Sequence, residues 1–266
     1  MTWYENLQRV HQRRSESDYK IDFALNLLLT LLTCFLWGFV GWYRIVRRRD
    51  LHFARSADFS ATAVAALAER ADALGRRPLV ESHLRTLDVI SRDLRTQARE
   101  RGALVWTLLG LLTAKVAFLL MFYFLEEDYR RQEQTEVEFA QHLGEALRLL
   151  EMPCAQAPFQ VCVRERSYAL YLLLTIFTCG LFGFYWFYKV NEEENCHMDA
   201  HAAWESQVLA CLTVAPGAAP GTAPPPASVA PGAPYPPYPP YPPPAPGMPP
   251  APPAGPSGAP PAPAAG

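Results

Sequence analysis

The chain has 266 residues and a formal net charge of −2 at pH 7, and half of its residues are hydrophobic. The charges are unevenly distributed along the chain, so the net charge does not identify a partner. The sequence contains no glycine-rich phosphate loop, Cys-x-x-Cys, His-Glu-x-x-His or Gly-x-Ser-x-Gly. It therefore indicates neither an enzyme nor a cofactor.

Three long apolar segments precede the C-terminal tail. Residues 23–43 and 168–188 contain no charge, and residues 103–124 contain only Lys115. A helix of about 20 apolar residues spans roughly 30 Å of hydrocarbon, and Trp and Tyr gather at the segment ends as they do at membrane interfaces. We therefore expect an all-α membrane protein with three transmembrane helices, preceded by an amphipathic N-terminal segment over residues 1–22. The alternative, buried helices of a soluble protein, would need a far larger polar shell.

The arginines predict the orientation of these segments. Residues 44–102 are rich in arginine near the membrane boundaries, whereas residues 125–167 contain more acids than arginines. By the positive-inside rule, residues 44–102 are cytoplasmic and residues 125–167 lie outside. We therefore expect a multi-pass protein of the bacterial inner (plasma) membrane, with its N-terminus outside and its C-terminus cytoplasmic. Arg47–Arg49 are expected to anchor to anionic lipid and not to nucleic acid.

The polar segments are expected to be helical. Within residues 44–102, Gly75 and Pro78 mark a turn between two apolar seams, which predicts a cytoplasmic helical hairpin. Residues 125–167 predict an acidic extracytoplasmic helix followed by a cysteine loop, and residues 189–215 a cytoplasmic helix. The acidic helix has an apolar stripe that needs a partner helix, in the same chain or in a homo-oligomer. The stripe consists of Ala140, Leu143, Leu147 and Leu150.

Two cysteines lie close together in the predicted extracytoplasmic loop. Cys154 and Cys162 are separated by a short stretch that contains a proline. A disulfide bond between them would persist in an oxidising compartment. We predict this bond, with two free thiols in a turn as the alternative.

The first and third apolar segments are copies of each other. With an offset of 145 and no gap, residues 24–44 align on residues 169–189 with 12 identities in 21 positions. In both copies small residues recur four residues apart on one helix face, and the middle segment has a similar stripe. Small residues at such spacing allow helices to pack closely. The predicted packing residues are Thr30, Cys34 and Gly38, then Thr107, Gly110 and Ala114, and finally Thr175, Cys179 and Gly183.

The third segment carries the pattern Leu-Thr-x-x-Thr-x-Gly-x-x-x-x-Tyr-Trp-x-Tyr-Lys between Leu174 and Lys189. This pattern resembles that of a bacterial inner-membrane family known only as a domain of unknown function. The first copy departs from it, with Phe35 in place of the glycine and Val40-Gly41 in place of Tyr-Trp. The resemblance implies a membrane protein and no known activity. The Thr-Cys-Gly sequence also leaves open a kinked or re-entrant segment instead of a straight helix.

Lys115, near the middle of the second segment, is the candidate functional residue within the membrane. A charge at that depth costs about 2.5 kcal/mol or more, so an ionisable residue there indicates transport or sensing unless it is neutral or snorkels. After the third segment, His197 and His201 are four residues apart, a spacing that can hold a metal. Further ligands at a defined spacing are not evident, so no metal site is predicted.

The C-terminal tail, residues 216–266, contains most of the 26 prolines and no charge. Such a chain is extended and cannot bury a core, so it is expected to be disordered. It is either a flexible spacer or a ligand for a proline-motif-binding protein.

Taken together, these features predict a non-enzymatic membrane scaffold or interaction protein that contacts the lipid bilayer. The alternative is a small transporter or channel built on the duplicated segment, with Lys115 at its centre.

Overall fold

A computed structural model describes residues 2–113, 116–152 and 159–213. These residues belong to one compact unit, and every element of regular structure among them is a helix. The tail predicted to be disordered lies outside the described residues. The helices are α1 (Trp3–Gln12), α2 (Arg14–Ser17), α3 (Phe23–Leu32), α4 (Leu36–Ala73), α5 (Arg77–Gln97), α6 (Ala103–Leu112), α7 (Val116–Leu149), α8 (Tyr168–Phe177) and α9 (Leu181–Thr213).

Each apolar segment forms a helical hairpin. In each hairpin a short outer helix (α3, α6 or α8) is followed by a turn and then by a returning helix (α4, α7 or α9). Only the first turns of each returning helix belong to the hairpin. The prediction of one straight helix through each segment was therefore wrong, since a turn interrupts the helix in all three, including the Thr-Cys-Gly segment for which the sequence left a break open. Among the residues that the structure describes, no helix combines the length and the apolar character needed to cross a membrane.

A threonine closes the turn of every hairpin. Thr33, Thr113 and Thr178 each follow the last residue of an outer helix, and each hydroxyl donates to the carbonyl four residues earlier at 2.7–2.8 Å. The same oxygens accept the backbone N–H four residues later at 2.8–3.1 Å. Each of these threonines therefore bonds both to the last turn of one helix and to the first turn of the next.

In the first and third hairpins, the backbone turns left-handed directly after this threonine. The angle φ is +47° at Cys34 and +69° at Phe35, and it is +50° at Cys179 and +92° at Gly180. A residue with a side chain pays about 1–2 kcal/mol in this conformation, so the surrounding bonds must hold it. Both cysteines are exposed. They are turn residues and do not pack between helices, contrary to the prediction.

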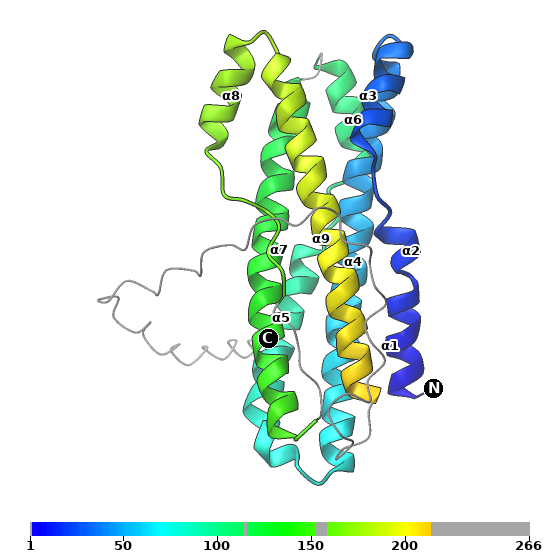
Figure 1. Ribbon diagram of the computed structural model, residues 1–266, viewed down its shortest axis with the longest axis vertical. Coiled ribbons are helices and arrows are strands. Elements are labelled where there is room, and N and C mark those ends of the chain that lie inside the picture. The colour runs from blue at the N-terminus through cyan, green and yellow to red at the C-terminus, as the bar shows by residue number, and fades with distance from the viewer. Residues whose placement is uncertain (1, 114–115, 153–158, 214–266) are drawn as a thin grey trace, which may run out of the picture. The chain divides into compact units, whose positions relative to one another are not determined.

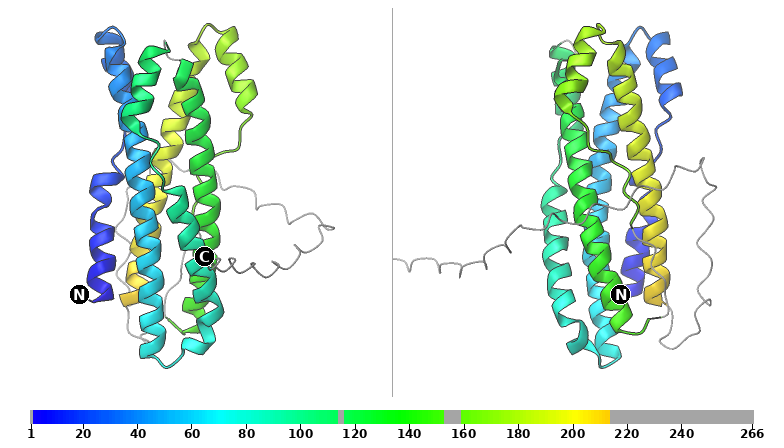
Figure 2. Two further views of the ribbon diagram at one scale, coloured as in Figure 1. Left: turned by 180° about the vertical axis from the view of Figure 1, so that it is seen from behind. Right: turned by 60° about the vertical axis from the view of Figure 1, so that its left-hand side comes forward.

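The returning helices continue beyond the hairpins and form a bundle with α5. Figure 1 shows the hairpin turns at one end of this bundle, and both views in Figure 2 agree. Helices α4, α7 and α9 therefore run in the same direction, away from the hairpins, and α5 runs back beside α4 and α7. Helix α1 packs against α4 and α9.

The segments that were expected on opposite sides of a membrane share one hydrophobic core. Leu87 of α5, Leu143 of α7 and Val208 of α9 are fully buried in the same cluster. Residues 44–102 and 125–167 therefore pack against each other, which is incompatible with opposite faces of a bilayer. The apolar stripe of α7 has its partner helices within the same chain.

The turn between α4 and α5 lies where glycine and proline indicated it. Gly75 has a φ of +64°, which suits a residue without a side chain, and Pro78 lies in the first turn of α5. A proline there loses no hydrogen bond because the first N–H groups of a helix have no partner within it.

The N-terminal segment is part of the bundle. Thr2 and Glu5 form a capping box at the start of α1, which satisfies N–H groups that a helix leaves unpaired. Leu7 is fully buried in the same core as α5 and α7.

In the first and third hairpins, small residues let the two helices approach each other closely. A Cβ atom added at Gly38 would lie 3.4 Å from Thr30 Cγ2, and one added at Gly183 would lie 3.2 Å from Thr175 Cγ2. These predicted packing residues therefore contact each other within one hairpin and not between different segments.

In the middle hairpin the glycine lies on the outer helix, and the side chain that packs against it lies on the returning helix. A Cβ atom added at Gly110 would lie 2.0 Å from the ring of Phe118, so the glycine makes room for that ring. Thr107 donates its hydroxyl to the carbonyl of Ala103 at 2.8 Å, within its own helix. Ala114 lies outside the described residues.

This complementarity predicts a coupled pair of substitutions. Gly110→Thr should lower the free energy of unfolding by about 1–3 kcal/mol, because the Phe118 ring must move. Phe118→Gly should cost about 3–5 kcal/mol through loss of a buried ring. The double variant recreates the Thr–Gly pair of the other hairpins, so its loss should be smaller than the sum. Strictly additive losses in a denaturant titration in detergent would contradict this packing.

Candidate functional site

A layer of buried ionisable side chains crosses the bundle between two apolar clusters. One cluster lies at the base of the hairpins and includes Phe122 and Trp186, and the other lies farther along and includes Phe139 and Trp204. The buried charged and histidine side chains of this layer include Arg48, His52, Arg55, Glu133, Glu136, Glu194, His197, His201 and Glu205. Each charge removed from water costs several kcal/mol unless it is paired. The stability of the bundle therefore depends on how the groups of this layer are paired.

Three histidines of the layer converge on one point. His52 comes from α4, and His197 and His201 lie one turn apart on α9. Nε2 of His52 is 3.1 Å from Nε2 of His197, and one nitrogen from each of the three rings lies within 4.8 Å of the others. Each side chain is at most 1% exposed, so water does not reach the centre freely.

A carboxylate holds each of these rings at Nδ1. The pairs are Asp18 with His52 at 2.9 Å, Glu133 with His197 at 3.0 Å and Glu205 with His201 at 3.2 Å. A carboxylate accepts hydrogen bonds, so the Nδ1 atom of each ring carries the donated proton. All three rings consequently turn Nε2 toward the centre.

Glu136 of α7 lies at the same centre. Its Oε2 is 2.8 Å from Nε2 of His201 and 3.9 Å from Nε2 of His197. Burial would raise the pKa of Glu136, but these histidines outweigh burial and lower it to about 2. Burial would likewise lower the pKa of His201, yet Glu136 and Glu205 raise it to about 10. At His52, burial prevails and lowers the pKa to about 4. The centre thus favours positive charge beside Glu136.

Arg55 of α4 compensates part of the negative charge around the histidines. Its guanidinium donates to both oxygens of Glu205 and to Asp18, each at 2.8 Å. These are the carboxylates that hold His201 and His52. The supporting carboxylates are therefore fixed on both sides, by an imidazole and by a guanidinium.

Two of the arginines expected at the membrane surface are buried instead. Arg48 pairs with Glu194 of α9, and Arg49 pairs with Asp128 of α7 at 3.0 Å. Both arginines are at most 2% exposed. The prediction that Arg47–Arg49 anchor to anionic lipid was therefore wrong for these two.

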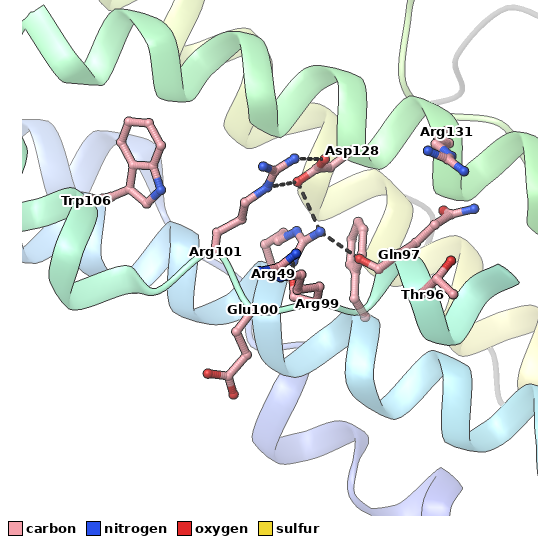
Figure 3. Close-up of a pocket in the computed structure, with 10 residues that line it drawn as sticks. Arg49, Thr96, Gln97, Arg99, Glu100, Arg101, Trp106, Asp128 and Arg131 are labelled. Atoms are coloured by element: carbon pink, nitrogen blue, oxygen red, sulfur yellow. Dashed lines mark hydrogen bonds and ion pairs between the residues drawn. The ribbon is translucent and has the colours of Figure 1, made fainter. Parts of the chain in front are cut away.

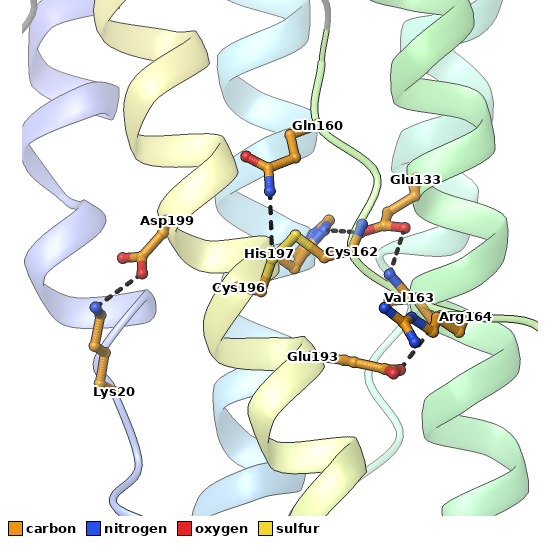
Figure 4. The surroundings of a disulfide bond; sticks show 10 residues. All are labelled: Lys20, Glu133, Gln160, Cys162, Val163, Arg164, Glu193, Cys196, His197 and Asp199. Carbon is orange, nitrogen blue, oxygen red and sulfur yellow. Dashed lines mark hydrogen bonds and ion pairs between the residues drawn. A yellow bond between two sulfur atoms is a disulfide. The ribbon is translucent and has the colours of Figure 1, made fainter. Parts of the chain in front are cut away.

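A disulfide bond joins the chain after α7 to α9, next to the histidines. Cys162 is bonded to Cys196, which directly precedes His197, as Figure 4 shows. The predicted bond between Cys154 and Cys162 was therefore wrong, because the chain after α7 runs back along α9. Cys154 itself lies outside the described residues. Cys211, near the end of α9, is also disulfide-bonded.

The same stretch of chain orients Glu133. The backbone N–H groups of Cys162 and Val163 donate to its two carboxylate oxygens at 2.9 and 3.0 Å (Figure 4). The ring of Phe159 lies beside His197, with 6.1 Å between ring centroids. The disulfide, this stretch of chain and the histidine centre therefore form one structural unit.

Most of the exposed large apolar side chains among the described residues lie on the hairpins. In the described part of the chain outside the hairpins, the exposed large hydrophobic residues are Tyr4, Leu79, Val89 and Val161. The residues directly before and after the turns are 60–82% exposed, and they are Leu32, Leu36, Leu112, Val116, Phe177 and Leu181. Soluble monomers rarely expose an apolar surface of this extent.

A polar pocket of about 410 Å³ lies between the end of α5 and the start of α6. Figure 3 shows two of its arginines, Arg49 and Arg101, bonded to acceptors of the protein itself. Arg101 donates twice to Asp128, at 2.6 and 2.8 Å, and Arg49 donates to the carbonyl of Gln97 at 2.9 Å. These bonds give the arginines a structural role, and we assign the pocket no ligand.

The sequence revealed only part of the histidine centre. The spacing of His197 and His201 was visible, but His52 precedes His197 by 145 positions and lies on another helix. Glu133 and Glu136, three residues apart on α7, carried no recognisable motif. Lys115, the residue singled out as functional, lies outside the described residues.

Comparison with protein families gives a match over part of the chain. A family model described as a domain of unknown function (DUF4234) matches residues 166–215. This region contains the third hairpin, Cys196 and two of the three histidines, and it includes the pattern that carried the resemblance. The match indicates no specific function. No curated protein and no solved structure matches the chain.

The disulfide bond gives a direct prediction. Replacing Cys162 and Cys196 by serine should lower the free energy of unfolding by about 3–4 kcal/mol, because the bond spans 34 residues of sequence and restricts the unfolded chain. Cys34 and Cys179 are free and exposed, so their replacement by serine is the matched control and should change little. Equal stability of both double variants in chemical denaturation would argue against the bond.

Proposed function

We propose that the protein is a membrane-bound helical scaffold whose three hairpins insert into one leaflet of a bilayer, with the bundle on one side of it. The observation that carries this proposal is the exposure of apolar side chains around the hairpin turns. Such a surface is unfavourable in water. Lipid is a suitable cover because the turns lie at one end of the bundle (Figure 2).

The length of the hairpins fits a single leaflet. Helices α3, α6 and α8 each contain 10 residues, so at 1.5 Å per residue each is about 15 Å long. Half of a hydrocarbon core of about 30 Å is also about 15 Å. A hairpin of this length reaches the middle of the bilayer and returns to the same face.

In the described part of each turn, a threonine hydroxyl pairs with backbone groups, as insertion would require. Backbone groups in hydrocarbon need partners within the protein, and the turn threonines bond to both the outer and the returning helix. The one strongly polar side chain of the first hairpin, Asn26, is also paired, because its Oδ1 accepts the indole N–H of Trp37 at 3.1 Å.

Charged and aromatic residues mark the base of the hairpins. The charges nearest to each hairpin are Asp22 and Arg44, Arg101 and Glu126, and Arg166 and Lys189. Aromatic residues at the same level include Trp42, Tyr43, Trp106, Tyr123, Tyr168 and Tyr188. Trp and Tyr are enriched at the boundary between hydrocarbon and water, so this level is the expected membrane surface.

The disulfide bond supports the outer side of the inner (plasma) membrane. A bond such as Cys162–Cys196 persists in an oxidising compartment, and residues 44–102 belong to the same bundle. The bundle and the N-terminus then lie outside the cytoplasm. Some of the arginines that suggested a cytoplasmic position form ion pairs inside the bundle, as Arg48 does with Glu194. A homo-oligomer and a proline-motif-binding partner for residues 216–266 remain predictions from the sequence.

Cysteine labelling tests the hairpin arrangement. Lys20 and Arg47 flank the first hairpin, and each would be replaced by cysteine in a chain that carries Cys34→Ser and Cys179→Ser. A membrane-impermeant maleimide should label both positions from the outer face of intact spheroplasts. Labelling of the two positions from opposite faces would contradict the hairpin. Labelling of both only after lysis would preserve the hairpin and reverse the side of the bundle.

Substitutions at the turns test the contact with lipid. Replacing Leu32, Leu112 and Phe177 by serine should weaken vesicle binding roughly 100-fold or more, because burial of each such side chain contributes about 1.5–3 kcal/mol. The matched control replaces Leu79 and Val89, which are 56% and 59% exposed on the bundle. Flotation with liposomes measures both. Equal loss of binding in the two variants would argue against insertion of the turns.

The transporter alternative makes a different prediction at Lys115. If the hairpins only anchor the protein, Lys115→Leu should leave vesicle binding equal or stronger, because a costly charge is removed from an apolar segment. A transporter would instead lose ion flux in proteoliposomes while keeping its fold. Measuring binding and flux on the same preparation separates the two functions.

A further inference from the structure

The histidine centre has the spacing of a metal site. In a tetrahedral site with metal–nitrogen bonds of about 2.0 Å, neighbouring donor atoms are about 3.3 Å apart. Here Nε2 of His52 and Nε2 of His197 are 3.1 Å apart. Oε2 of Glu136 is 2.8 Å from Nε2 of His201 and 3.9 Å from Nε2 of His197. Donor atoms from α4, α7 and α9 thus already surround one point.

Two of these nitrogens need a positive charge between them. The Nδ1 protons of His52 and His197 are donated to Asp18 and Glu133, so each Nε2 presents a lone pair. Two lone pairs at 3.1 Å repel each other unless a proton or a metal ion lies between them.

The charges around the centre also call for a cation. The carboxylates in contact with the three rings are Asp18, Glu133, Glu136 and Glu205. Among the contacts described for these groups, the guanidinium that faces them is that of Arg55, which pairs with Asp18 and Glu205. A metal ion at Nε2 of His201 replaces the proton that Glu136 and Glu205 otherwise stabilise there. With the imidazoles neutral, as in a metal complex, the four carboxylates and Arg55 leave an excess of negative charge in a buried region. A divalent ion offsets most of that excess.

The support around the rings is that of metal-bound histidines. A histidine that binds a metal almost always donates its other N–H to a carboxylate, a carbonyl or water, which fixes the ring and its tautomer. All three rings here have a carboxylate in that position. All three carboxylates are themselves held, Asp18 and Glu205 by Arg55, and Glu133 by backbone N–H groups of the disulfide-linked chain.

From this arrangement we infer that His52, His197, His201 and Glu136 bind a divalent transition-metal ion, with Zn²⁺ as the best-fitting member of the class. Imidazole nitrogens suit Zn²⁺, Co²⁺ and related ions, whereas Mg²⁺ and Ca²⁺ prefer oxygen ligands. Four buried protein ligands describe a closed, structural site. The ion joins α4, α7 and α9, the three helices that leave the hairpins.

Metal titration of the full chain tests this inference. The protein is purified in detergent without a polyhistidine tag, treated with EDTA, and titrated with Co²⁺ and with Zn²⁺. We expect one ion per chain, visible d–d absorption of four-coordinate Co²⁺ that Zn²⁺ abolishes, and a higher melting temperature with Zn²⁺. Mg²⁺ should give none of these effects.

Histidine variants assign the ion to the centre. His52→Gln and His197→Gln should each weaken Co²⁺ binding by about 100-fold or more, and Glu133→Gln, which keeps every ligand, by about 10–100-fold. The matched control is His83→Gln. Its ring lies beside that of His142 between α5 and α7, with 3.2 Å between the Nδ1 atoms, and its loss should leave the affinity unchanged. If His52→Gln fails to fold, Glu133→Gln carries the test.

Three results would overturn the inference. The first is an EDTA-treated wild-type chain that keeps its fold and binds neither ion, which would mean that the centre holds only protons. The second is binding that survives His52→Gln and is lost in His83→Gln. The third is Co²⁺ absorption that is unchanged by Glu133→Gln and His197→Gln.

Discussion

In each apolar segment the chain turns back at a threonine whose hydroxyl bonds to both sides of the turn, and the rest of the structure depends on these three turns. Thr33, Thr113 and Thr178 end the outer helices after ten residues, so α4, α7 and α9 leave the hairpins in one direction. Only with that shared direction can the polar parts of these helices meet. Straight helices of the same composition would separate them by the thickness of a bilayer.

The buried polar layer is a consequence of this meeting. His52 and Arg55 from α4, Glu136 from α7 and His201 from α9 come together between two apolar clusters. Each group would be costly to bury alone, so the bonds among them fix the register of the long helices. The disulfide at Cys196 adds the extended chain to the same layer. The hairpins and the layer therefore belong to one arrangement, in which the hairpins expose apolar side chains at one end and the polar centre orders the bundle.

The sequence predicted the secondary structure better than the course of the chain through the fold. The helices and the turn at Gly75 follow from local patterns of residues, so they could be predicted. A run of about 20 apolar residues fits both a straight span and a hairpin, and the threonine that decides between them bonds equally well inside a helix. The partner of Cys162 and the position of His52 depend on which helices are neighbours, which no local pattern records.

The most direct test of the account is whether α5 and α7 touch in the native full-length protein. His83 of α5 and His142 of α7 are in contact, and both can be replaced by cysteine in a chain that carries Cys34→Ser and Cys179→Ser. The account predicts that a short bifunctional maleimide links the two positions within one chain in native membranes. Failure to cross-link, with each cysteine labelled from a different side of the membrane, would contradict it.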